Sequence, residues 1–136
     1  MCWESHSIPE LKIASEDIPV FKVVKKDHSA YYQPFYYYSL NMVYTTNLGT
    51  PLGYIWMCQY QINEGFHSYS TEKCKVITLN GDSINTYISV LYNNIRLDHY
   101  VNATVMKCVI PKGAQYYLNN RGEYVSNKIK PICVGQ

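Results

Sequence analysis

The chain is unusually rich in tyrosine, and this constrains its fold more than any other feature. Its 136 residues include 15 Tyr against three Phe and two Trp, and several are adjacent, as in Tyr31–Tyr32, Tyr36–Tyr37–Tyr38 and Tyr116–Tyr117. A tyrosine ring packs like a core side chain, but its hydroxyl requires a polar partner or water. The composition therefore favours half-buried sheet faces or a contact surface. We expect that part of this tyrosine population faces outward.

Length and charge indicate one globular domain over residues 1–136. At this size about two thirds of the unfolded chain's surface can be buried on folding, so neither a metal nor a disulfide is needed. The net charge is only +2, and Lys25–Lys26 is the one basic pair. Because nucleic-acid-binding proteins usually gather Lys and Arg on one face, the sequence gives no strong signal for a nucleic-acid partner.

No segment of the sequence is typical of a signal peptide or a membrane span. Residues 1–10 contain acids and a proline, and no run approaches the ~20 apolar residues that a spanning helix needs. The five cysteines include no C-x-x-C pair. Without an export signal we expect them to stay reduced, with Cys58 and Cys108 as small core residues inside strands.

Several segments have the residue pattern of strands. Residues 17–24 are rich in β-branched side chains, and Pro19 suits a strand entry. Residues 36–44 are rich in aromatics that favour strands. Residues 54–62 alternate, with Tyr54, Trp56, Cys58, Tyr60 and Ile62 on one face, and 63–65 then form a turn.

The C-terminal third predicts a central strand followed by a hairpin. Residues 100–110 are apolar on both faces near their end, as expected of a strand covered on both sides. Residues 114–118 and 123–132 flank the sequence Asn119–Asn120–Arg121–Gly122, which is typical of a tight turn between two strands.

The middle of the chain predicts helices. Ser70–Thr71–Glu72 offers an N-cap for a short one, and Asp82 offers one for a longer helix over residues 83–95. The apolar stripe of that helix recurs at three- and four-residue steps and comprises Ile84, Tyr87, Ile88, Leu91, Tyr92 and Ile95. Strands at both ends with helical pattern between them favour an α+β fold. We expect a mostly antiparallel sheet that could curl toward a barrel, packed on the main helix at about 83–95.

Three stretches together carry a resemblance to known proteins. They are residues 16–23, the Gly65–Phe66–His67–Ser68 segment, and residues 109–117 with Ile110–Pro111–Lys112–Gly113, leading to 122–126. This combination resembles small uncharacterised proteins of gut Bacteroidales and their phages. In those proteins a Gly-Phe-His segment precedes a helix, and an Ile-Pro-Lys-Gly turn precedes a C-terminal hairpin. The resemblance implies an origin, with a location in the bacterial cytoplasm or in a virion, and no particular chemistry.

A fainter likeness is to the ADP-ribosyltransferase superfamily. Lys22 in Val20–Phe21–Lys22–Val23, the Ser68–Tyr69–Ser70–Thr71 segment and Glu123 are similar to its strand-end cation, its Ser-Thr-Ser-like segment and its late catalytic Glu. Lys22 departs from that pattern because an ammonium cannot reproduce the planar fork of an arginine. The resemblance implies an adenine-nucleotide substrate.

His67 is the polar residue with the clearest functional interpretation. Gly65 permits a close backbone approach and the neighbouring aromatics could wall a pocket, so the imidazole could bind a ligand or transfer a proton. The alternative interpretation, which one histidine without an adjacent nucleophile or acid pair favours, is local hydrogen bonding that fixes the turn. The four histidines lack ligand spacing and no glycine-rich phosphate loop precedes a helix, so we expect no metal and no cofactor.

The tyrosine triplet has two interpretations. In a strand Tyr36 and Tyr38 share one face while Tyr37 points to the other, so at least one ring must face away from a single core. Exposed rings could stack on a ligand or anchor in a partner, whereas buried rings would only line a sheet.

Two functional hypotheses follow. In the first, the chain is a non-enzymatic binding or interaction protein of phage or mobile-element origin. It would use Tyr36, Tyr37, Tyr38, His67 and Tyr69 to hold a protein partner or a small ligand such as a nucleotide or sugar, with self-association open. In the second, it is a degenerate ADP-ribosyltransferase-like enzyme with His67 and Glu123 in one cleft.

Overall fold

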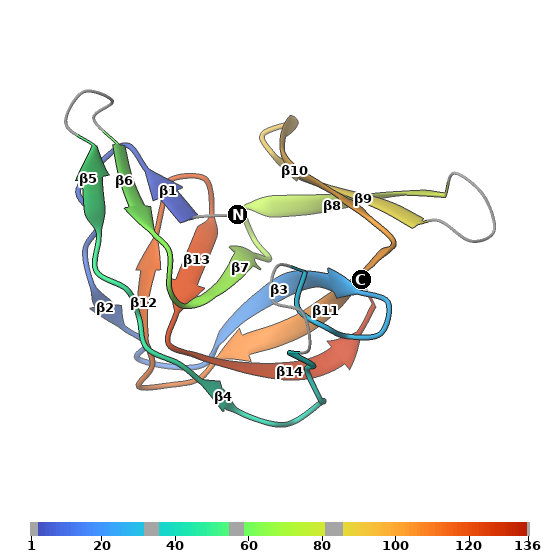
Figure 1. The fold of residues 1–136 in the computed structure, drawn as a ribbon, viewed down its shortest axis with the longest axis horizontal. Helices are drawn as coiled ribbons and strands as arrows, with labels where there is room; N and C mark the ends of the chain where they lie inside the picture. Colours follow the sequence, from blue (N-terminus) through green and yellow to red (C-terminus); the bar gives the residue numbers. More distant parts are fainter. Residues whose placement is uncertain (1–2, 32–35, 55–58, 81–85, 136) are drawn as a thin grey trace.

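The computed structural model describes residues 3–31, 36–54, 59–80 and 86–135 and contains strands only. The expected α+β class is therefore wrong, because no helix occurs among these residues and none of the sheets closes into a barrel. Figure 1 shows one large sheet with two three-stranded sheets beside it.

The main sheet has eight strands, all paired antiparallel. In spatial order they are β2 (Lys12–Ile13), β12 (Gln115–Leu118), β13 (Glu123–Ser126), β7 (Phe66–Ser70), β3 (Ile18–Lys25), β11 (Ala103–Ile110), β14 (Lys128–Val134) and β4 (Tyr44–Thr45).

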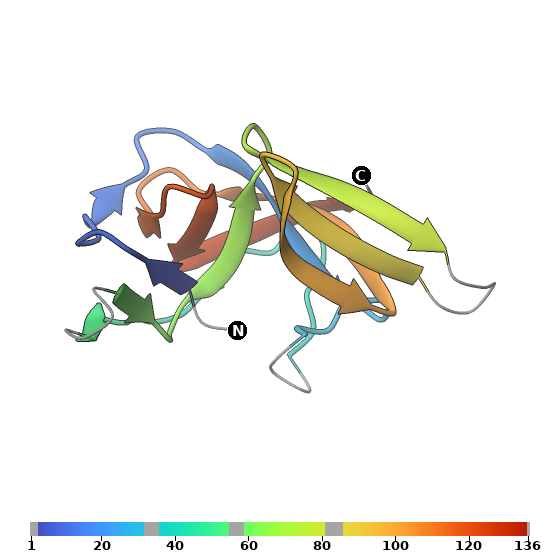
Figure 2. The same ribbon diagram turned by 90° about the horizontal axis from the view of Figure 1, so that it is seen from above.

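The β1 sheet contains β1 (Trp3–Ser5), β6 (Gln59–Ile62) and β5 (Leu52–Tyr54). The β8 sheet contains β10 (Ile95–Val101), β9 (Thr86–Tyr92) and β8 (Cys74–Asn80). The turned view in Figure 2 shows the β8 sheet leaning over the main sheet, with the ends of β8 and β9 projecting beyond it.

The segment expected to be the main helix is a β-hairpin from Thr86 onward, and its first residues, 83–85, lie outside the described chain. Asn93 and Asn94 have φ of 49° and 62°, which is the left-handed backbone of a tight two-residue hairpin turn. Val90, which the helical stripe omits, is fully buried, whereas Ile95, which it includes, is 65% exposed. The β-branched residues Ile88 and Val90, two positions apart, are both buried, and this spacing suits a strand better than the helical stripe.

Several predicted strands are confirmed. The predicted strand 17–24 corresponds to β3, residues 63–65 connect β6 to β7 as predicted, and the β12–β13 hairpin flanks 119–122. The predicted strand 123–132 is confirmed only in its first part, because it breaks at Asn127 and its second part, β14, pairs with β11 and β4. The stretch 100–110 contains β11, which lies between β3 and β14 inside the main sheet, as expected of a central strand. Asn102, with φ of 50°, separates it from β10.

Other predictions are wrong or fall outside the described residues. Residues 71–73 form a turn between β7 and β8 in place of a short helix. The segment 36–44 is strand only at its end, in β4, because Asn41 with φ of 64° interrupts it. The predicted strand 54–62 corresponds to the end of β5 and to β6, and residues 55–58 between them are not described.

The main sheet is covered on both faces, which explains the nearly continuous apolar sequence of its central strands. Val20 and Val24 of β3 point to one face and pack with Met106 and other apolar side chains. Phe21 and Val23 point to the opposite face, where the inner side of the β8 sheet contributes Ile88, Val90 and Tyr100. A third cluster, under the β1 sheet, comprises Trp3, Ile62, Tyr117 and Val125.

Candidate functional site

His67 and Glu123, which the sequence singled out separately, lie together on one face of the main sheet. β7 and β13 are neighbours, and their register pairs Glu123 with Tyr69 and His67 with Val125. His67 and Glu123 are therefore diagonal neighbours, with Nε2 and Oε2 at 3.5 Å. The side chain of His67 is 21% exposed and that of Glu123 only 5%.

The turn that precedes β13 fixes the carboxylate of Glu123. Asn119 accepts hydrogen bonds from the amides of Arg121 and Glu123, each at 3.0 Å, and its Nδ2 donates to Glu123 Oε1, also at 3.0 Å. Arg121 Nη2 lies 3.1 Å from the same oxygen. Burial favours the neutral acid, but the nearby imidazole, the amide of Asn119 and the guanidinium outweigh it and lower the pKa of Glu123.

A second buried carboxylate, Asp98, faces His67 from β10. Tyr69 Oη lies 2.6 Å from the hydroxyl oxygen of Tyr100 and donates to Asp98 Oδ2. Burial raises the pKa of Asp98, opposed by the hydrogen bond from Tyr69 and by His67. The imidazole packs edge-on against the Tyr69 ring, with centroids 4.9 Å apart. We call His67, Tyr69, Asp98, Tyr100, Arg121 and Glu123 the polar cluster.

The tyrosine triplet lies on the opposite face of the main sheet from His67 and Tyr69. Tyr36 and Tyr38 share one face, as predicted, with their rings edge to face at 5.3 Å and both packed near Phe66. Tyr38 is only 4% exposed, whereas Tyr37 is 53% exposed. Within the triplet Tyr37 is exposed, Tyr36 is half-buried and Tyr38 is buried, and the five residues predicted to bind are divided between the two faces of the main sheet.

The three elements of the ADP-ribosyltransferase likeness come from adjacent strands but do not converge. The register pairs Tyr69 with both Phe21 and Glu123, so Lys22 and Ser68 point to the other face. The ammonium of Lys22 donates to the main-chain oxygen of His67 at 2.5 Å and lies 5.5 Å from the centre of the Tyr38 ring. Burial lowers the pKa of Lys22 to about 8, although Cys108 nearby raises it.

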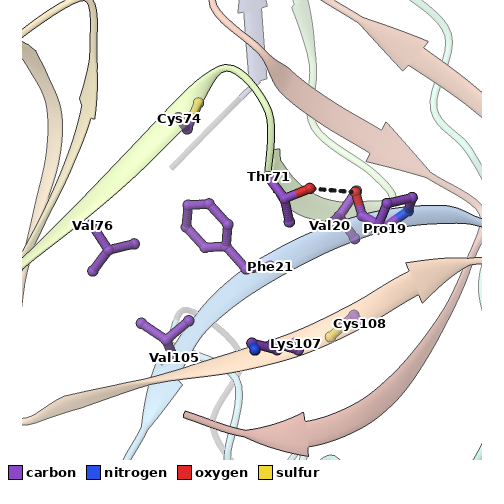
Figure 3. Close-up of a pocket in the computed structure, with 9 residues that line it drawn as sticks. All are labelled: Pro19, Val20, Phe21, Thr71, Cys74, Val76, Val105, Lys107 and Cys108. Carbon is purple, nitrogen blue, oxygen red and sulfur yellow. Dashed lines mark hydrogen bonds between the residues drawn. The ribbon is translucent and has the colours of Figure 1, made fainter. Parts of the chain in front are cut away.

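A pocket of about 280 Å³ lies between the main sheet and β8 (Figure 3). It is lined by Pro19, Val20, Phe21, Thr71, Cys74, Val76, Val105, Lys107 and Cys108. Lys107 is the only charged residue in this set, and it is exposed. Burial raises the pKa of Cys74 to about 11 and that of Cys108 to about 12. Both thiols therefore stay neutral near pH 7 and add to an apolar wall.

The pocket and the polar cluster share a wall. The ring of Phe21, which lines the pocket, stacks on Tyr69 with centroids 5.2 Å apart. The thiol of Cys74, also a lining group, donates to the main-chain oxygen of Arg121 at 3.4 Å. The hydrogen bonds of the polar cluster therefore hold in place two of the side chains that shape the pocket.

Sequence reasoning missed the pocket because its walls come from β3, β8 and β11, segments far apart in sequence whose packing no local pattern specifies. The available signal was Lys107, a charge inside the otherwise apolar run of β11, which marks where that strand reaches solvent. The prediction that Cys108 is a small core residue inside a strand is confirmed, because it is buried in β11. Cys74, Cys108 and Cys133 are free thiols, and Cys133 is exposed. Cys2 and Cys58 lie outside the described residues.

Across the described residues, no group of His, Cys, Asp and Glu is arranged to hold a metal ion. The same residues include no helix of the length and apolarity needed to cross a membrane. Comparisons of the chain with protein-family models, with curated proteins and with solved structures give no match.

Proposed function

We propose that this chain is a non-enzymatic binding protein that holds an apolar group of a protein partner or small ligand in the pocket beside β8. The observation that carries the proposal is the pocket itself, about 280 Å³ of space walled by side chains from both sheets. Ligand sites of drug size span about 300–1,000 Å³, so this pocket suits a small ligand or one large side chain.

The chemistry of the lining supports binding over catalysis. Valines, Phe21 and neutral thiols present apolar surface, and fully burying one Leu or Phe side chain is worth about 1.5–3 kcal/mol. Lys107 adds one positive charge that could select an anionic group. This proposal replaces the tyrosine surface expected from the sequence, because Tyr38 is buried in the core and Tyr36 is half-buried against the same cluster.

Binding of anilinonaphthalene sulfonate, an apolar dye with one negative charge, tests the proposal. We expect saturable one-to-one binding to the native protein, measured by fluorescence titration. Val76→Trp, which fills the pocket, should abolish it, and Ile77→Trp, on the outward side of the same strand, should not. Lys107→Glu should weaken binding without disturbing the core, because Lys107 is exposed. It provides a second test if Val76→Trp alters the fold. The proposal is rejected if the wild type and the three variants bind the dye equally, or if none of them binds it.

The cellular setting belongs to the same proposal. The Gly65–Ser68 and Ile110–Gly113 segments support a phage or mobile-element origin, with a location in the bacterial cytoplasm or in a virion. Quantitative mass spectrometry of purified particles and of the lysate they come from separates the two locations.

One observation favours a second candidate function, an enzyme acting on an adenine nucleotide. His67 and Glu123 are 3.5 Å apart, and the two carboxylates near that imidazole have pKa values shifted in opposite directions, as in acid–base pairs. NAD should then raise the melting temperature, and Glu123→Gln should abolish nicotinamide release without unfolding the protein. No shift and no release reject this candidate.

A further inference from the structure

The β8 sheet has an outer face that the proposed pocket does not use. Ile88 and Val90 of β9 point to the inner face and pack against the main sheet, so their neighbours in the strand point outward. Figure 1 shows the three strands of this sheet at one side of the fold. On the outer face Ile77, Leu79 and Val101 are 44%, 54% and 49% exposed. Exposed apolar side chains that lie together on one face commonly mark an interaction site.

One end of the outer face is positively charged. Lys75 of β8 and Arg96 of β10 both pair with Leu91 of β9, so they lie in one row across the sheet. Adjacent strands are about 4.8 Å apart, which separates the two backbone positions by about 10 Å. Both side chains are exposed, and within the described chain neither forms an ion pair.

No acidic side chain opposes these two cations on the outer face. Asp98 is the only acidic residue of the three strands, and it is buried on the inner face. The outer face therefore attracts anions, although the net charge of the whole chain is only +2. The whole-chain charge, which gave no strong signal for a nucleic-acid partner, does not register this local arrangement.

Beside the charged row the outer face carries a pair of stacked rings. Tyr87 of β9 and His99 of β10 have ring centroids 5.8 Å apart and an interplanar angle of 12°. The hydroxyl oxygen of Ser89 lies 3.1 Å from His99 Nδ1, which helps to hold the imidazole in this orientation. Leu79 and Val101 pair with Tyr87 from the two neighbouring strands. The rings therefore stand among exposed apolar side chains, where a further flat ring can pack on them.

We propose that the outer face of the β8 sheet binds single-stranded nucleic acid, with phosphates at Lys75 and Arg96 and unpaired bases at Tyr87 and His99. Proteins that bind single strands combine cations for the backbone with aromatic side chains on which bases stack. A flat sheet is a known platform for such stacking. A duplex hides the faces of its bases, so only a single strand can use the charged row and the rings together.

Two other anionic partners fit this face less well. An anionic membrane would attract the same cations, but insertion would bury the polar groups of Ser89 and His99 among lipid chains. An acidic peptide would satisfy the charges of Lys75 and Arg96, whereas each nucleotide supplies both a charge and a flat ring. The outer face lies on the opposite side of the β8 sheet from the pocket, so this inference does not depend on the proposed function.

Fluorescence anisotropy with a labelled single-stranded oligodeoxythymidylate of about 16 nucleotides tests the inference on the full chain. We expect saturable binding whose logarithm falls with the logarithm of salt concentration with a slope of about −1.4, as for two phosphate contacts. Lys75→Gln combined with Arg96→Gln should remove most of this slope. The matched pair Lys12→Gln and Lys112→Gln removes the same charge at exposed positions outside this face and should leave the slope unchanged.

An abasic oligomer of the same length measures what the bases contribute. It should bind at least about fivefold more weakly, as expected for the loss of one stacked base. His99→Ala, at an exposed position, should weaken binding of the normal oligomer and leave binding of the abasic one unchanged. Amide shifts of the wild-type protein provide a measurement without any substitution, and they should cluster in residues 75–79, 87–91 and 96–101.

The remaining outcomes overturn the inference. Absence of saturable binding does so directly. Equal affinity for the oligomer, its duplex, the abasic chain and polyglutamate would mean that charge alone attracts the ligand. Tighter binding to phosphatidylglycerol vesicles than to the oligomer would identify a membrane-binding face instead. Amide shifts confined to the pocket segments would place the oligomer in the pocket and leave the outer face without a role.

Discussion

The hydroxyl of Tyr69, on β7, lies 2.5 Å from Oδ2 of Asp98, on β10, and this hydrogen bond ties the main sheet to the β8 sheet. Tyr69 is only 1% exposed and Asp98 9%, so the contact is made away from water. Phe21 stacks on the same tyrosine from the pocket side. The position of β8 over the pocket therefore depends on a polar contact buried between the sheets.

Tyr69→Phe should destabilise the protein by about 1–3 kcal/mol. The change removes the donor and leaves the Asp98 carboxylate without one of its buried hydrogen bonds, which costs more than the average value of such a bond. Urea unfolding followed by circular dichroism measures the loss. Tyr37→Phe is the matched control, because Tyr37 is 53% exposed and should change stability by less than about 0.5 kcal/mol. Equal effects of the two changes would contradict the role of the buried contact.

Glu123→Gln should lower stability at neutral pH by about 1–2 kcal/mol, and the deficit should vanish in acid. The folded-state pKa of Glu123 lies below its ordinary value of 4.5, so the unfolded chain binds more protons and stability rises with pH through this window. The wild-type advantage is therefore present above 4.5 and disappears as pH falls through the folded pKa. Unfolding curves from pH 7 down to about 3 test this dependence.

Asp98→Asn is the control for Glu123→Gln, because the pH dependence of stability that Asp98 contributes has the opposite sign. Burial raises the pKa of Asp98 above 3.8, so the folded chain binds the extra proton and the wild type loses stability as pH rises through the folded pKa. The Asn variant should lack that loss, and its advantage over the wild type should grow with pH. Parallel profiles for the two variants would mean that the carboxylates are not held in opposite states.

Gly122→Ala should destabilise the protein more than Gly113→Ala, by about 1 kcal/mol or more. Both glycines have positive φ, 75° and 88°, so both substitutions introduce backbone strain. At Gly122 a new Cβ would also lie 2.9 Å from Lys73 Cβ and 3.1 Å from Cys74 Sγ, whereas at Gly113 nothing lies within 4 Å. Thermal melts of the two variants give the comparison, and similar losses would argue against close packing of the 119–122 turn on the start of β8.

Replacements of Asn94 discriminate the hairpin from the helix that the sequence suggested. Because Asn94 has φ of 62°, Asn94→Gly should be more stable than Asn94→Ala. In a helix the order would reverse, with Ala more stable than Gly by about 1 kcal/mol. Chemical unfolding of both variants under one set of conditions decides between the two structures.

Local patterns were sufficient where one strand or turn carries the information. β3 was predicted from β-branched residues after Pro19, and the β12–β13 hairpin from the polar residues around Gly122. The segment 86–95 was misassigned because its apolar residues fit a helical stripe as well as a strand, and the Asn93–Asn94 turn decides the matter. Hydrophobic periodicity does not register a two-residue turn of this kind, although adjacent Asn residues favour it.

The site depends on contacts between residues far apart in sequence. His67 and Glu123 were both named from the sequence, but their proximity follows from β13 pairing with β7, which no local pattern specifies. The pocket likewise requires the β8 sheet to pack over β3 and β11. Lys22 lies on the face of the main sheet opposite to that of Glu123. This position follows from the strand register, which a local sequence pattern does not specify.

Mapping of amide chemical shifts by NMR during titration with anilinonaphthalene sulfonate tests the central claim most directly. If the pocket beside β8 is the binding site, the shifts should cluster in Val20–Phe21, in Cys74–Val76 and in Val105–Cys108, the segments that line it. Shifts confined to the polar cluster around His67 and Glu123, or to the exposed Tyr37, would contradict the account.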